Sequence, residues 1–160
     1  MYCIWLTFDS PDIFEIIADL ATNYNSPLFQ PHCTIIGKTD KSLQRLKSAV
    51  VNLASNSKLI DVHPVKISYT ANLWRALYIE LKEKDIVTNW HKDACDSLNI
   101  ECDNDYLPHI SLVYKSISVG EKEKIINKIK LKSEYKIQSI QIIDCSEKVE
   151  EWRTVFELKS

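Results

Sequence analysis

Residues 107–114 read LPHISLVY and residues 30–37 read QPHCTIIG, so the chain contains the pattern Pro-His-x-(Ser/Thr) twice, each time running into apolar residues. From the composition of the chain, two such patterns are expected on the order of 10⁻⁴ times per sequence. The repetition therefore indicates two halves of one site rather than two unrelated strands that each carry a histidine.

Both patterns lie on predicted β-strands, in which side chains i and i+2 point to the same face. His32 and Thr34 then share one strand face, and His109 and Ser111 share another. Cys33 turns to the face opposite His32, which argues against a Cys–His nucleophile pair. If the two strands meet, two imidazoles and two hydroxyls converge.

The periodicity of apolar residues places the two patterns at matching points of a repeated strand–helix–strand–helix order. Helices are expected to begin near residues 11, 40, 85 and 118. Strands are expected at residues 2–8, 34–37, 76–81, 110–114, 136–145 and 152–158, and residues 58–68 are expected to form one or two strands broken near Pro64. This order predicts a duplicated α+β unit, and the length favours a single domain over residues 1–160.

The bulk composition is that of an ordinary soluble chain and limits the kinds of partner. The net charge is −2 and only three residues are arginine, whereas proteins that grip long nucleic acids usually carry a basic surplus. No apolar run approaches the roughly 18 residues of a membrane helix, and the short apolar N-terminus lacks a basic leader. We therefore expect a cytoplasmic monomer with a small ligand, and neither long nucleic acid nor a membrane as partner.

Five cysteines, with no Cys-x-x-Cys among them, favour free thiols in a reducing compartment. Cys95 and Cys102 are close enough in sequence for a local disulfide under oxidising conditions, and the sequence leaves that alternative open. Zinc sites use three or four ligands, and no Asp, Glu or Cys recurs beside both motif histidines, so no metal or other cofactor is expected. The remaining histidines, His63 and His91, are expected to be solvated.

The two histidines and two hydroxyls suit hydrolysis of a phosphate ester. A neutral imidazole can take a proton from water while a protonated one gives a proton to the leaving oxygen, each role contributing typically 10²–10⁴-fold. Imidazole titrates near pH 6.5, so both roles are accessible at neutral pH. The hydroxyls can donate hydrogen bonds to phosphate oxygens as charge develops on them.

These motifs resemble those of the 2H phosphoesterase superfamily, and most nearly its plant and yeast cyclic phosphodiesterases. The similarity runs from YCIWLTF (2–8) through FQPHCTIIG (29–37) and LWRALYI (73–79) to YLPHISLVY (106–114), which covers most of the chain in outline. The resemblance implies a bilobal fold in which two antiparallel sheet lobes, with helices outside, enclose a central cleft.

The resemblance also implies roles for six residues. His32 and His109 would be the catalytic acid–base pair, and Thr34 and Ser111 would hold the phosphate. Tyr114 would line the pocket, and Trp74 would lie against the base of the substrate. The sequence departs from this branch in lacking a recognisable basic rim, since Arg75 is the only arginine near the motif strands in sequence.

The implied activity is metal-independent ring-opening of a small nucleotide, either ADP-ribose 1″,2″-cyclic phosphate or a nucleoside 2′,3′-cyclic phosphate, to the 1″- or 2′-phosphate. A second hypothesis is a phosphodiesterase that degrades 2′-5′ or 3′-5′ linked oligonucleotides or cyclic dinucleotide immune signals. A third is a module that binds nucleotides or RNA ends without turnover. The same four motif residues serve the first two hypotheses, so the sequence does not separate them.

Overall fold

Seven strands and four α-helices make up the fold in the computed structural model, which describes all of residues 1–160. In chain order they are β1 (Tyr2–Phe8), α1 (Pro11–Tyr24), β2 (His32–Thr39), α2 (Leu43–Asn56), β3 (Pro64–Ser68), β4 (Leu77–Leu81), α3 (Lys84–Leu98), β5 (His109–Val113), α4 (Val119–Lys128), β6 (Ile137–Asp144) and β7 (Arg153–Lys159). Short 3₁₀ turns, η1 (Leu73–Arg75) and η2 (Val149–Glu151), precede β4 and β7. The predicted α+β class and the repeated element order are confirmed.

The strands form one sheet in the order β3-β4-β5-β2-β1-β6-β7, and every neighbouring pair is antiparallel. Two lobes can be distinguished: a four-stranded lobe (β2, β1, β6, β7) and a three-stranded lobe (β3, β4, β5). They are joined where β2 and β5 share a single registered pair, Cys33 with Ile110. The two expected antiparallel lobes are therefore present, and they meet at the centre of the two sequence motifs.

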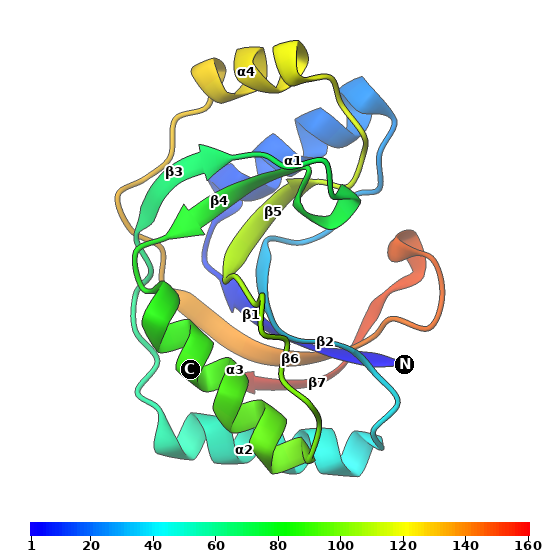
Figure 1. Cartoon of the computed structure of the whole chain (residues 1–160), viewed down its shortest axis with the longest axis vertical. Coiled ribbons are helices and arrows are strands. Elements are labelled where there is room, and N and C mark those ends of the chain that lie inside the picture. Colours follow the sequence, from blue (N-terminus) through cyan, green and yellow to red (C-terminus); the bar gives the residue numbers. More distant parts are fainter.

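Helices α1 and α3 each pack against the lobe that does not contain the strand preceding them in the chain. Helix α1 follows β1 of the four-stranded lobe but packs against β5, and α3 follows β4 of the three-stranded lobe but packs against β2. In Figure 1, α1 and α4 accompany β3, β4 and β5, whereas α2 and α3 lie together against the other lobe. The pattern relates the two halves of the chain by an approximate twofold axis near the β2–β5 junction.

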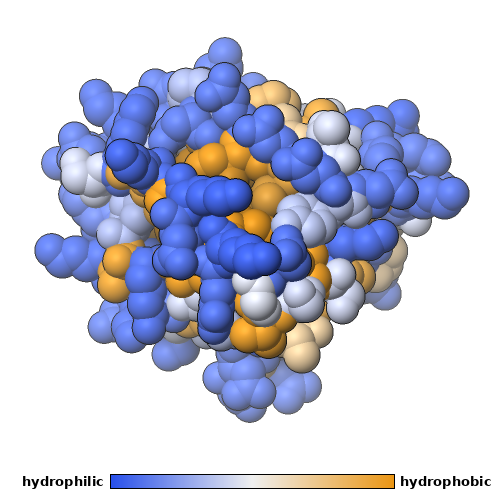
Figure 2. Space-filling view, turned by 90° about the horizontal axis from the view of Figure 1, so that it is seen from above, coloured by the Kyte–Doolittle hydropathy of each residue, from blue (hydrophilic) through white to orange (hydrophobic).

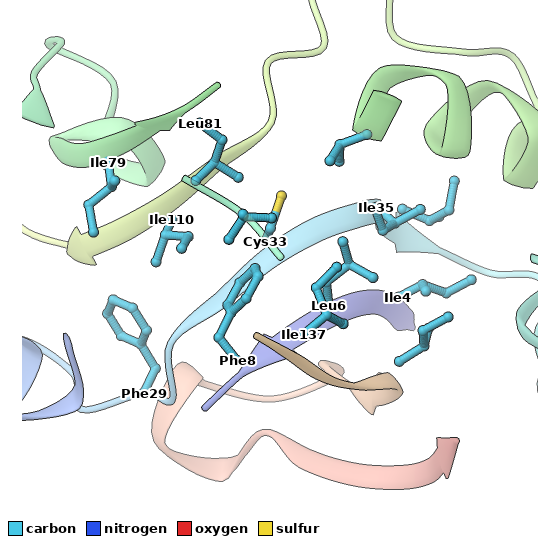
Figure 3. Close-up of a cluster of buried hydrophobic side chains, with 14 of the residues drawn as sticks. Ile4, Leu6, Phe8, Phe29, Cys33, Ile35, Ile79, Leu81, Ile110 and Ile137 are labelled. Atoms are coloured by element: carbon cyan, nitrogen blue, oxygen red, sulfur yellow. The ribbon is translucent and has the colours of Figure 1, made fainter. Parts of the chain in front are cut away.

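The core is one cluster of 34 buried residues that extends through both lobes. Figure 3 shows Cys33 and Ile110 within this cluster, among Phe8, Phe29 and Ile79. Cys33 therefore does turn away from the face of His32, as strand alternation predicts. Hydrophilic residues cover most of the face seen in Figure 2, with hydrophobic ones visible between them. None of the four helices combines the length and apolar character that a membrane span requires.

Two predicted boundaries were wrong. The second helix begins after Ser42, whose hydroxyl accepts a hydrogen bond from the Arg45 amide, rather than at Asp40. Residues 58–68 are interrupted near Pro64 as expected, but only the part from Pro64 onward, β3, is a strand. Before that proline only Val62 is paired, in an isolated bridge to Tyr135, because this segment crosses from α2 to the edge of the sheet.

Candidate active site

His32 is the first residue of β2, and its ring is fixed by the chain just before it. Its Nδ1 lies 2.7 Å from the carbonyl oxygen of Gln30. A carbonyl oxygen only accepts, so Nδ1 carries the proton and Nε2 of the neutral ring is left as an acceptor. Pro31, between the two residues, favours an extended conformation of Gln30.

His109 repeats this arrangement at the start of β5. Its Nδ1 lies 2.7 Å from the carbonyl oxygen of Leu107, with Pro108 between them. The doubled Pro-His pattern therefore has a structural counterpart, since in both copies the carbonyl of the residue before the proline selects the ring tautomer. Both rings line the same cavity, of about 430 Å³.

The register of the junction explains how the four motif side chains converge. Cys33 pairs with Ile110 and both point into the core. Antiparallel pairing through these two residues sets position 32 across from 111 and position 34 across from 109. The site is thus an approximate twofold pair, with one histidine and one hydroxyl contributed by each strand.

Burial holds both imidazoles neutral. Removal from water lowers the pKa of His32 to about 4, opposed by the Gln30 carbonyl and reinforced by the nearby His109. The ring of His32 is stacked on Trp5, with centroids 3.6 Å apart. Burial also lowers the pKa of His109, where the Leu107 carbonyl opposes it and the positive Arg75 adds to it. His109 is only half-buried, so the two histidines are not equivalent.

The hydroxyls of Thr34 and Ser111 differ in their hydrogen bonding within the protein. The Thr34 hydroxyl lines the cavity and makes no hydrogen bond within the protein. Ser111 also lines the cavity, but its hydroxyl donates to the carbonyl oxygen of Trp74 at 2.7 Å. Turn η1 brings that carbonyl over β5. Thr34 can therefore donate to a phosphate directly, whereas Ser111 must first rotate away from Trp74.

An aromatic wall flanks the imidazoles. Tyr114 is stacked on Phe29, with centroids 4.1 Å apart, and its hydroxyl lies 3.3 Å from Nε2 of His32. Because Nδ1 of His32 carries the proton, Tyr114 donates this hydrogen bond. Trp74 meets Tyr114 edge-on at 5.0 Å and is 45% exposed. Tyr114 and Trp74 thus line the same cavity as the four motif residues.

Six further residues line the cavity and were not predicted from the sequence: Cys3, Trp5, Gly37, Lys38, Asp103 and Trp152. Trp152 lies nearly parallel to Trp74, at 6.2 Å and 19°, and Nζ of Lys38 lies 5.3 Å above the Trp152 ring. Trp5 was missed because β1 is buried on both faces, and only the β1–β2 register, which pairs Trp5 with Thr34, places it beside the motif. No sequence signal places Trp152 or Lys38 at the site. Trp152 reaches the cavity because of the order of strands in the sheet, and Lys38 lies where the β1–β2 register is irregular.

Lys38 also supplies positive charge that the sequence did not reveal. It lines both the central cavity and an adjoining one of about 510 Å³, which contains Arg75. The residues common to both cavities are Thr34, Gly37, Lys38, Trp74, Asp103 and His109. The central cavity is therefore lined by one cation, Lys38, and one carboxylate, Asp103, and Arg75 lines the adjoining cavity.

The other two histidines lie outside the central cavity. His63 is half-exposed and pairs with Glu83 and Glu134. His91, expected to be solvated, is buried, because α3 packs this face against β2 and its Nδ1 meets the Ile35 carbonyl at 2.7 Å. All five cysteines are free thiols.

No protein-family model matches the chain, and a search of curated proteins found no significant match. Solved structures do match over 99% of it: apo E. coli LigT (TM-score 0.64, 13% identity, 95% of that chain), LigT complexed with 3′-AMP (0.64, 11%, 96%) and a crystal structure named only as a phosphoesterase (0.63, 12%, 96%). The fold is that of LigT. At this identity the LigT likeness establishes the architecture, and the chemistry has to be argued from the side chains. Other LigT structures contain NADP⁺, ATP and phosphate.

Proposed function

We propose that the protein belongs to the 2H phosphoesterases and hydrolyses a cyclic phosphate ester on a small nucleotide without a metal ion. The observation that carries this proposal is the matched pair of imidazoles, each anchored at Nδ1 by a 2.7 Å contact to a carbonyl two residues earlier and both lining one cavity. A module that only binds nucleotides needs no such acid–base pair. The complexes of LigT with 3′-AMP, NADP⁺ and ATP support a nucleotide as the ligand class.

The reaction is an in-line attack of water on phosphorus. Nε2 of one histidine takes a proton from the water as its oxygen bonds to phosphorus, and Nε2–H of the other gives a proton to the ester oxygen whose bond to phosphorus breaks. The ring opens to a phosphate monoester and a free hydroxyl. Thr34 donates to a non-bridging oxygen, and Lys38 offsets its negative charge.

The asymmetry of burial assigns the two roles. His32 has the more strongly buried ring, so the neutral form needed by a base is favoured, and Tyr114 has to release its Nε2 before that atom takes a proton from water. His109 is half-buried, so protonation of its ring costs less in desolvation. A bound phosphate raises the pKa of both rings, which allows His109 to be protonated when substrate is present. We assign His32 as the base and His109 as the acid.

The aromatic wall supports a substrate that carries a nucleobase. Trp74 and Trp152 present their rings beside the phosphate-facing residues, and stacking on such rings tolerates any base because every base has a π-face. ADP-ribose 1″,2″-cyclic phosphate and the nucleoside 2′,3′-cyclic phosphates both combine a base with a strained five-membered phosphate ring.

The test is a turnover screen by chromatography in EDTA. The panel holds ADP-ribose 1″,2″-cyclic phosphate, the four nucleoside 2′,3′-cyclic phosphates, 2′-5′ oligoadenylate and several cyclic dinucleotides. His32→Ala and His109→Ala test the site, and His63→Ala is the matched control because this histidine lies outside the cavity.

The expected result is turnover of a monocyclic phosphate that both site substitutions abolish and the control leaves unchanged. Turnover confined to linked or cyclic oligonucleotides would replace the cyclic-phosphate proposal by the signal-degrading one. Binding without turnover anywhere in the panel would overturn the enzyme assignment.

A further inference from the structure

A second group of reactive side chains lies at the C-terminal end of α3, outside the phosphate-facing residues. His91 and Cys95 are one helical turn apart and therefore lie on one helix face. Cys102 follows in the connection that leads to β5. The ligand-capable atoms of these three residues all lie within 4.8 Å of one another, and His91 and Cys95 are buried while Cys102 is half-buried.

The His91 ring is held in the tautomer that a metal ligand requires. Its Nδ1 lies 2.7 Å from the Ile35 carbonyl, so Nδ1 carries the proton and Nε2 keeps its lone pair. Sγ of Cys95 lies 3.6 Å from Nε2 and 3.9 Å from Nδ1, which places it above the ring. Tyr106 stacks on the same ring at 3.9 Å and 8°, and its own hydroxyl donates to the Thr34 carbonyl. Metal-binding histidines almost always donate the second ring N–H to a carbonyl or carboxylate in this way.

The spacing fits a tetrahedral centre with nitrogen and sulfur ligands. Zinc–sulfur bonds of about 2.3 Å and zinc–nitrogen bonds of about 2.0–2.1 Å, at a tetrahedral angle, place the two ligand atoms about 3.6 Å apart. Nε2 of His91 and Sγ of Cys95 have this separation, but Sγ lies above the ring, so the Cys95 side chain has to rotate to share a metal ion with Nε2. A thiol–imidazole hydrogen bond would account for that distance too, but not for the second thiol beside the pair.

We propose that His91, Cys95 and Cys102 form a binding site for a soft divalent cation of the zinc class, with the fourth position open to the adjoining cavity. Binding displaces the two thiol protons, so a dication and two thiolates form a neutral centre. Glu101, Asp103 and Asp105 line the same cavity and favour the approach of a cation, although Lys38 and Arg75 lie in it as well.

The location indicates what the metal would do. It would link α3 to the connection before β5, whose Leu107 carbonyl holds His109 and whose Tyr106 hydroxyl holds the Thr34 carbonyl. The cation would therefore brace the elements that position both motifs. No ligand of the site faces the central cavity, so metal binding and phosphodiester hydrolysis are separately measurable.

The test uses cobalt(II) and zinc(II) as probes on metal-free protein kept in a non-thiol reductant. Cobalt titration should give one ion per chain, with a thiolate-to-cobalt band and the visible bands of a tetrahedral complex, and zinc should displace it. Cys102→Ser removes one sulfur at a half-buried position and should weaken cobalt binding more than about 100-fold, since even outer-shell changes cost 10–100-fold.

The matched control is Cys145→Ser. Sγ of Cys145 lies 2.9 Å from Sγ of Cys3, which makes this pair the competing thiol site in the chain. The control should bind cobalt like the wild type, and melting temperatures of both variants without metal show whether each has folded. The site is overturned if Cys102→Ser folds and binds as tightly as the wild type, or if the control loses the bands.

Discussion

At the scale of single residues, the hydrogen bond at Nδ1 of each motif histidine determines which ring nitrogen can react. Carbonyl contacts at Nδ1 of His32 and His109 leave Nε2 as the reactive atom of both rings. Differences in burial then separate the two rings, because burial of His32 lowers its pKa to about 4 whereas His109 is only half-buried. The two sequence motifs are nearly identical, but their histidines differ in burial and therefore in pKa.

This asymmetry predicts the pH dependence of kcat/KM, which reports on the free enzyme. Activity needs neutral His32 and protonated His109, so it rises with pH through the pKa of His32 and falls through that of His109. The first is about 4 and the second is lowered from 6.5, so we expect a bell-shaped profile with its maximum between these values. Steady-state kinetics measure it, and a flat profile from about pH 5 to 9 would contradict the assignment.

The free hydroxyl of Thr34 gives a second prediction. Thr34→Val keeps the shape of the side chain but removes the donor to a non-bridging phosphate oxygen, and loss of one such donor typically costs about 10²–10³ in kcat. Thr34→Ser restores the donor and should recover most of the activity. If Thr34→Val turned over substrate as fast as the wild type, the hydroxyl would have no part in the transition state.

All six residues expected at the site from sequence line one cavity. Four of them could be placed by strand alternation around two identical patterns, which is local information. Trp152 and Lys38 could not, because one depends on which strands neighbour β1 and the other on register irregularities in β2. The commitment of the Ser111 hydroxyl to the Trp74 carbonyl is likewise a tertiary contact with no local sequence signal.

At the scale of elements, the turns before β4 and β7 are the parts that sequence periodicity did not predict, and both present a tryptophan to the cavity. Turn η1 carries Trp74, and Trp152 directly follows η2. The long elements were predicted well since their apolar spacing is regular, as for β1, whose expected and observed bounds coincide. A 3₁₀ turn of three residues has no period to detect.

The paired tryptophans predict a base-dependent effect. Trp152→Leu removes a stacking surface worth about 1–3 kcal/mol per base, which corresponds to roughly 5- to 150-fold in affinity. We expect KM for a nucleoside cyclic phosphate to rise by this factor, while an abasic ribose cyclic phosphate is unaffected. Leu73→Ala, at an exposed position of η1 that does not line the cavity, is the control. Equal losses for both substrates would indicate a structural role instead.

At the scale of the whole molecule, the buried imidazole of His32 makes folding depend on pH. Its pKa is about 4 in the folded chain and 6.5 in an exposed ring. Between these values the unfolded state binds more protons, so the free energy of unfolding rises with pH. The stabilisation by neutral His32 is fully present above pH 6.5 and is lost as the pH falls toward 4, amounting to about 3 kcal/mol.

Comparison with His32→Gln tests this linkage. Denaturant unfolding at several values between pH 4 and pH 7 should show a steeper pH dependence for the wild type than for the variant. The His109→Gln variant, altered at the less buried ring, should differ less from the wild type. Parallel curves for wild type and His32→Gln would mean that the imidazole is solvated and would remove the basis for its role as base.

The exchange of helices between the lobes has a consequence for how the protein is made. As the chain emerges from the ribosome, α1 appears before β5, the strand on which it packs, and β1 appears long before β6, its neighbour in the sheet. Neither lobe is complete within one half of the chain. The cavity wall at Trp152 and the part of the core that β6 contributes (Ile137, Ile140 and Ile142) therefore both form only when the last strands have been synthesised, so the binding pocket and the complete core arise together late in synthesis.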